Sequence, residues 1–142
     1  MGRFAFLEHI TQADSAIEVV GEDLGDLFAT AARALAESMV DPATLAADRE
    51  RDVVLSAARL DLLLFDWLTE IIYRKDADGE VFPCAEVSVE GEGPCRLTAR
   101  LRGGGLDPAT TVTRSDLKAV TLHRFRLEPV DDGWRARFVI DV

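Results

Sequence analysis

The sequence predicts an α+β fold, in which two helices pack on a mostly antiparallel sheet within a single compact domain. Two segments carry apolar residues at three- and four-residue spacing, as amphipathic helices do. The other apolar segments are short and are separated by turn residues, which is typical of strands joined by hairpins. With 142 residues, of which 48% are hydrophobic, the chain suits one ordinary domain covering residues 1–142.

The N-terminal part of the chain predicts a pair of strands followed by a helix. Residues 3–9 and 15–21 are rich in aromatic and β-branched side chains and form the two strands. Asp23 suits the N-cap of the helix, and Asp26 lies in its first turn, where the helix dipole favours a carboxylate. The helix ends before Pro42, because a residue that precedes proline avoids helical geometry. Its buried face comprises Leu24, Leu27, Phe28, Ala31, Leu35 and Met39.

The middle of the chain predicts a strand, a second helix and a hairpin. Residues 49–57 alternate charged and apolar side chains before becoming apolar, as a half-buried strand does. The second helix spans residues 60–74, and the hairpin pairs residues 81–89 with 95–102. The core stripe of this helix comprises Leu63, Leu64, Trp67, Leu68, Ile71 and Ile72.

The last third of the chain predicts a flexible loop and a final hairpin. Three consecutive glycines at 103–105 and the Asp-Pro pair at 107–108 favour the loop. Residues 119–128 and 134–142 form the last two strands, joined by a turn at 131–133.

The charge of the chain limits its partners. Sixteen basic residues stand against 26 acidic ones, for a net charge of −10. Such a field repels phosphates, so extensive direct nucleic-acid binding is not expected, whereas a basic protein partner or a divalent cation is favoured. Plain solubility is the alternative explanation of the same charge.

The location of the protein is predicted from its cysteines and apolar segments. In the predicted hairpin Cys95 lies opposite the region of Glu90 and not opposite Cys84, so no disulfide is expected, which fits a reducing compartment. No signal peptide is visible, and the apolar stretches are too short to span a bilayer. We therefore expect a soluble, cytoplasmic protein with no membrane partner.

Charged side chains in apolar surroundings identify candidate functional residues. Asp14 lies between the first two strands, Lys118 precedes an apolar run at 119–122 that favours burial, and Asp141 lies in the last strand. A charge in such a place costs free energy unless it is paired or binds an ion. Asp141 and the terminal carboxylate of Val142 are adjacent hard oxygen donors, suited to calcium, magnesium or manganese.

Each of these residues also has a structural explanation. Asp14 suits a turn, Lys118 suits the surface at the start of a strand, and the end of the chain suits exposure to solvent. A lone histidine at a strand end is more often packed or hydrogen-bonded than a metal ligand, which is the expectation for His9. For His123, packing is as compatible with the sequence as a functional contact.

Five segments together resemble the archeases, small acidic proteins that assist a GTP-dependent RNA ligase. Residues 6–9 with 13–21, residues 117–123 and the closing segment 138–142 carry three of the matches. The others are residues 36–42, which resemble the end of the family's first helix, and residues 62–73, which resemble its second helix. The chain departs from the family pattern by an apparent two-residue insertion between His9 and Ala13 and by Leu122, where the family often has tyrosine.

The resemblance implies an activator and not an enzyme. Archeases bind a divalent metal through aspartates that match Asp14 and Asp141, and a functionally important lysine matches Lys118, with His123 matching the histidine that follows. The implied partner joins 2′,3′-cyclic phosphate or 3′-phosphate RNA ends to 5′-hydroxyl ends in tRNA splicing or RNA repair. The archease would promote guanylylation and multiple turnover of that ligase.

Two other functions remain open at this point. Asp14, Lys118, His123 and Asp141 would also suit a small metal-dependent hydrolase. A ligand-binding or assembly module of the same fold is the other alternative. The chain contains no Gly-x-Ser-x-Gly motif and no phosphate-binding glycine loop.

Overall fold

The computed structural model describes residues 2–7, 14–91 and 93–142. Its elements follow the predicted order of strand pair, helix, strand, helix and two hairpins. They are β1 (Arg3–Phe6), β2 (Asp14–Gly21), α1 (Leu24–Met39), the 3₁₀ turn η1 (Pro42–Thr44), β3 (Arg49–Ala57), α2 (Leu60–Asp78), β4 (Glu80–Glu90), β5 (Cys95–Gly105), β6 (Ala119–Val130) and β7 (Gly133–Asp141).

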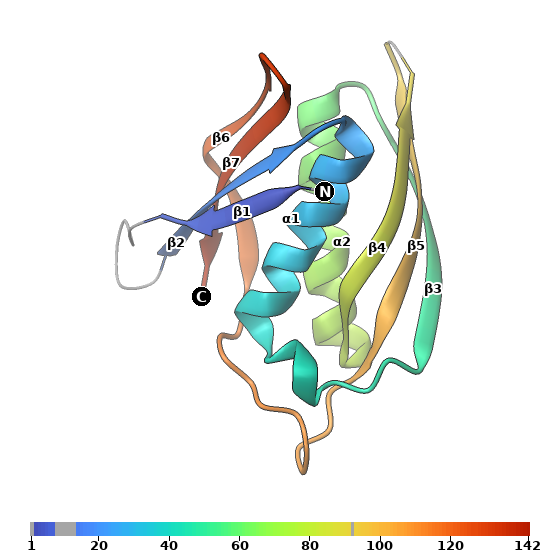
Figure 1. The fold of residues 1–142 in the computed structure, drawn as a ribbon, viewed down its shortest axis with the longest axis vertical. Helices are drawn as coiled ribbons and strands as arrows, with labels where there is room; N and C mark the ends of the chain where they lie inside the picture. Colours follow the sequence, from blue (N-terminus) through green and yellow to red (C-terminus); the bar gives the residue numbers. More distant parts are fainter. Residues whose placement is uncertain (1, 8–13, 92) are drawn as a thin grey trace.

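The strands form two antiparallel sheets, with the two helices between them (Figure 1). The four-stranded sheet has the order β1-β2-β7-β6, and the three-stranded sheet has the order β3-β5-β4. Both helices contact strands of both sheets, so the apolar faces of all three layers share one core. The predicted α+β class is confirmed, with the predicted sheet divided in two.

Helix α1 begins as its sequence predicts. The carboxylate of Asp23 accepts a hydrogen bond from the backbone N–H of Asp26 at 2.8 Å, which satisfies one of the free donors of the first turn. The carboxylate of Asp26 accepts from the N–H groups of Gly2 at 2.8 Å and Glu22 at 2.9 Å. This carboxylate therefore joins the N-terminal segment to the start of the helix.

Helix α2 is longer than predicted. The prediction ended it at residue 74, because the sequence from 76 to 79 resembles a turn, but the helix continues to Asp78. Gly79, with φ of 63°, then caps it in the left-handed conformation that glycine adopts most easily. The six residues of its predicted stripe are all buried. No helix in the described residues is long and apolar enough to cross a membrane.

The prediction of a flexible loop at 103–105 is wrong. These glycines form the end of β5, where Gly103 and Gly104 are buried. A Cβ atom on Gly103 would overlap the carbonyl oxygen of Val81, and one on Gly104 would overlap that of Ala46. The glycines are therefore required by the close approach of neighbouring backbones and not by chain flexibility.

The two cysteines are both free, as predicted. In the β4–β5 register Cys84 lies opposite Arg102, whereas Glu90 lies opposite Arg96, next to Cys95. The thiols therefore occupy distant positions along the hairpin, with Cys84 exposed and Cys95 buried.

Glu80 is a buried carboxylate, 2% exposed, at the start of β4. It accepts hydrogen bonds from Arg49 Nη1 at 2.9 Å and from Arg51 Nη2 at 2.7 Å. Burial by itself would raise the pKa of Glu80, but the hydrogen bonds and positive charge of the two arginines outweigh it and lower that pKa.

The lowered pKa predicts how acid affects stability. Ionised Glu80 stabilises the fold above its unfolded pKa of about 4.3, and this contribution is lost as pH falls through the lower folded pKa. We expect Glu80→Gln to reduce the free energy of unfolding by about 1–3 kcal/mol at neutral pH. Urea unfolding from pH 7 to 3 should show a shallower pH dependence for this variant. The exposed Glu90→Gln serves as the control, and equal slopes for Glu80→Gln and wild type would contradict the assignment.

Candidate functional site

Asp14 and Asp141 lie directly opposite one another on neighbouring strands. They are register partners in the β2–β7 pair, and Ala119 of β6 pairs with Asp141 from the other side. Residues in such positions have Cα atoms about 4.5–5.5 Å apart and project on the same sheet face. The side chain of Asp14 is outside the described part of the structure. The backbone nevertheless brings the beginning of β2, the beginning of β6 and the end of β7 together.

Lys118 joins this junction through its backbone. Its N–H donates to the carbonyl of Asp141 at 2.8 Å, while its side chain is exposed. The preceding residue, Leu117, is 2% exposed and packs in the core. The start of β6 is therefore held on one side by the core and on the other by β7, and the ammonium group of Lys118 remains accessible.

Lys75 anchors the same segment, and sequence reasoning assigned it no role. Its Nζ donates to the carbonyl of Leu117 at 2.7 Å and pairs with Asp116 and Asp76. Burial alone would lower the pKa of Lys75, but the hydrogen bonds to Asp116 and Asp76 and the charges of both raise it. A lysine in the last turn of a helix has an ordinary local explanation, so nothing in the sequence pointed to this long-range contact.

The predicted face of Asp141 is confirmed. Phe138 and Ile140 point into the core at 1% and 0% exposure, and Asp141 projects from the other face of β7, where it is partly exposed. Val142 is half-buried and packs against the core, beside Leu117 and Ile140 in a cavity of about 330 Å³. This packing holds the last residue close to the end of β7.

The apolar run at 119–122 is not buried as a whole, contrary to the prediction. Val120 is buried, but Ala119 is exposed and Leu122 is 65% exposed. The reason is a bulge: the β6–β7 register shifts between Thr121 and Arg126, and this irregularity turns part of the run outward.

His123 lies within the β6 bulge, between Thr121 and Arg126. His123 is exposed, and its backbone N–H donates to Thr121 Oγ1 at 3.3 Å. His9 lies outside the described residues. The backbone brings the positions of Asp14, Lys118 and Asp141 together.

The chemistry of the junction fits a hard divalent cation. Carboxylate oxygens are the ligands that calcium, magnesium and manganese prefer, and the register gives Asp14 and Asp141 adjacent positions. Within the described residues no group of three or more His, Cys, Asp or Glu side chains is placed to hold a metal. The register supports the two aspartates as the candidate donors at this junction.

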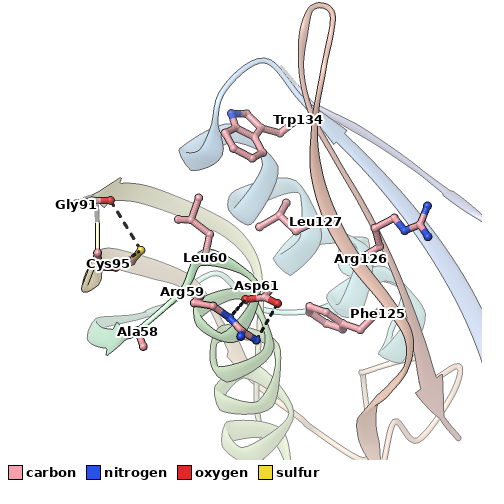
Figure 2. Close-up of a pocket in the computed structure, with 11 residues that line it drawn as sticks. Ala58, Arg59, Leu60, Asp61, Gly91, Cys95, Phe125, Arg126, Leu127 and Trp134 are labelled. Carbon is pink, nitrogen blue, oxygen red and sulfur yellow. Dashed lines mark hydrogen bonds and ion pairs between the residues drawn. The ribbon is translucent and has the colours of Figure 1, made fainter.

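A larger depression lies elsewhere in the molecule. Figure 2 shows this groove of about 660 Å³ at the N-terminus of α2, beside the ends of the β4–β5 and β6–β7 hairpins. Leu60, Leu127 and Trp134 form its apolar lining, and the ion pair between Arg59 and Asp61 lies at its edge. None of the predicted site residues lines it, so the candidate site follows from strand register and not from cavity size.

The chain matches known proteins along almost its whole length. Residues 4–142 match the Archease protein family (MTH1598/TM1083). The chain is 33% identical to the protein archease of Archaeoglobus fulgidus over 140 residues, which cover 99% of each chain. It is 32% identical to the protein archease of Methanosarcina mazei, covering 99% of this chain and 96% of that one.

Two solved structures share the fold. The solution structure of Methanobacterium thermoautotrophicum protein 1598 superposes with a TM-score of 0.80 and 28% identity, covering 98% of each chain. The crystal structure of an archease from Thermotoga maritima, described as a possible chaperone, has a TM-score of 0.55 and 18% identity, covering 96% of this chain and 94% of that one, and shows the fold alone. The resemblance seen in the sequence is confirmed, and the chain belongs to the archease protein family.

Proposed function

We propose that this chain is an activator protein, not itself an enzyme, that promotes guanylylation and multiple turnover of a GTP- and metal-dependent RNA ligase. The expected setting is tRNA splicing or RNA repair. Family membership supports the proposal. The observation that carries it is the junction of β2, β7 and β6, which gathers Asp14, Lys118 and Asp141 from distant parts of the chain.

The proposed metal ligands are the carboxylates of Asp14 and Asp141. A divalent cation bound here would supply positive charge to the phosphoryl group transferred in the ligase nucleotide site. The contribution of the protein is placement, because β7 lies between β2 and β6 and fixes the backbone of Asp141 from both sides. The exposed ammonium of Lys118 is available to balance the carboxylates or to contact the ligase.

The net negative charge of the chain supports a basic protein as its partner. A net charge of −10 favours approach to a ligase surface that is basic because it binds RNA, and such steering raises the association rate. The free cysteines agree with a reducing compartment, so we place this activity in the cytoplasm.

A ligation assay with the RNA ligase of the same organism tests the proposal. With this chain present at far less than one copy per ligase, we expect the yield of joined RNA to rise above one product per ligase. An equal amount of an unrelated protein of similar net charge controls for nonspecific effects. Unchanged yield and unchanged guanylylation would refute the proposed function.

A small metal-dependent hydrolase is the alternative function. It requires an acid–base group beside the carboxylates, for which His123 is the candidate. Turnover of a phosphoester by the pure protein, lost in Asp141→Ala, would favour that alternative over activation of a ligase.

A further inference from the structure

Two arginines face one another on the outer side of the four-stranded sheet. Arg126 of β6 and Arg137 of β7 are direct register partners, so their side chains project on the same face from neighbouring backbones. Like charges directly opposite one another destabilise an antiparallel pair. Both positions are exposed. Two like charges therefore lie side by side on this face, and the charges of Glu18 and Glu128 offset them only in part.

The neighbouring carboxylates leave this charge incompletely balanced. Glu128 pairs closely with Arg135, at 2.7 Å, and Glu18 lies 3.6 Å from Arg137. Among the described residues no carboxylate lies within ion-pair distance of Arg126 or of Arg124. In a chain of net charge −10, this is a local excess of positive charge on one face.

The β6 bulge adds an exposed apolar group and a third guanidinium. Leu122 is 65% exposed, and Arg124 is exposed two residues later. Arg124 has φ of 54°, an unfavourable conformation for a residue with a side chain and the only positive φ among the described non-glycine residues. We call Leu122, Arg124, Arg126 and Arg137 the β6 patch.

The β6 patch adjoins the groove at the N-terminus of α2, because Arg126 is one of the residues that line that groove. Figure 2 shows the side chain of Arg126 on the opposite side of β6 from the side chains of Phe125 and Leu127, which point toward α2. β6 is also the last strand of its sheet. The patch therefore lies at a sheet edge, where a partner can approach the backbone as well as the side chains.

The chemistry of the β6 patch favours an acidic protein segment over RNA. Guanidinium groups bind carboxylates in paired hydrogen bonds, and Leu122 suits an apolar side chain. Single-stranded RNA is bound by basic grooves with aromatic stacking platforms. The aromatic residue within the patch strand, Phe125, instead packs against Phe65 and Phe138, with ring centroids 5.9 and 6.4 Å away. The net charge of the chain opposes RNA as well.

We propose that the β6 patch docks an acidic, partly apolar segment of the protein partner, which, given the function proposed above, is the RNA ligase. The overall negative charge brings the two proteins together, and this small patch of opposite sign fixes their orientation. Complementary charges of this kind fix how two proteins are aligned in an interface.

Arg126→Glu provides the sharpest test. It replaces the repulsion with an attraction to Arg137, so we expect a melting temperature no lower than that of wild type. It also places a carboxylate against the acidic segment, so the Kd for the ligase, measured by biolayer interferometry, should rise at least tenfold. Arg126→Gln should give a smaller rise. Arg96→Glu, the same change at an exposed arginine of the other sheet, should leave the Kd unchanged.

Several outcomes separate this inference from the function on which it rests. Equal Kd values for wild type and Arg126→Glu would overturn the docking surface and leave the proposed function standing. Absence of ligase binding by wild type would overturn both. A lower melting temperature for both Arg126 variants would show that Arg126 has a structural role, which contradicts the proposal. Binding of a single-stranded RNA oligonucleotide by wild type, lost in Arg126→Glu, would identify RNA as the occupant instead.

Discussion

Asp141→Ala is expected to abolish stimulation of the RNA ligase while the domain remains folded, and Lys118→Ala is expected to do the same. Asp141 is partly exposed at the end of β7, and the side chain of Lys118 is exposed. The contact that joins them runs between backbone atoms, from the Lys118 N–H to the Asp141 carbonyl, and both substitutions preserve it. Each change therefore removes a charge from the proposed site and leaves this backbone contact in place.

The measurement combines three assays on each variant. Ligation yield reports function, thermal unfolding reports the fold, and calorimetric titration with calcium or manganese reports the proposed metal site. We expect Asp141→Ala to weaken metal binding at least tenfold. Asp141→Asn, which retains the shape but not the charge, should resemble it, because hard cations favour anionic oxygen.

Asp131→Ala is the matched control. It removes an exposed aspartate at the opposite end of the same β6–β7 hairpin, and we expect wild-type ligation, melting and metal affinity. If Asp141→Ala and Lys118→Ala lower the melting temperature as much as a core substitution does, these residues are structural and the proposed site is wrong.

Trp67→Ala is expected to have the opposite effect, lowering stability by about 3–5 kcal/mol. Trp67 is fully buried, and its indole Nε1 donates to the carbonyl of Phe28 at 2.9 Å. The substitution removes a large apolar group from the interface between α2 and α1 and leaves the Phe28 carbonyl without its partner. The lost apolar contacts and the lost hydrogen bond both weaken the helical layer that lies between the two sheets.

Urea unfolding measures this loss. Trp134→Ala is the control of identical chemistry, because Trp134 is only partly buried at the edge of the groove and should have a smaller effect. Trp67→Phe keeps most of the apolar volume and removes the hydrogen bond, so its loss should lie between wild type and Trp67→Ala. Equal losses for Trp67→Ala and Trp134→Ala would show that Trp67 does not have the central packing role assigned to it.

Local sequence patterns predicted most elements of this fold. The spacing of apolar residues located both helices and the stripe that each buries, and Asp23 marked the beginning of α1. The bounds of β3 at residues 49 and 57 agree with the prediction. These features depend on neighbours within a few residues along the chain, so periodicity and capping preferences are enough to reveal them.

The same reasoning failed where a distant backbone determines the outcome. Glycine is common in loops, but Gly103 and Gly104 belong to a strand because other backbone segments approach them closely. The run at 119–122 is apolar, yet a bulge against β7 exposes Leu122. Neither effect is visible in the residues themselves, because each depends on a partner that the chain reaches only on folding.

For the candidate site as well, some features could be predicted from the sequence and others required the tertiary structure. The sequence by itself, read through its family resemblance, determined which residues to consider, namely Asp14, Lys118, His123 and Asp141. Only the tertiary structure decided that Asp14 lies opposite Asp141 and that the backbone of Lys118 bonds to that of Asp141. The physical reason is strand register: a strand carries its own alternation of faces, but the partner of each residue is set by pairing between segments far apart in the chain.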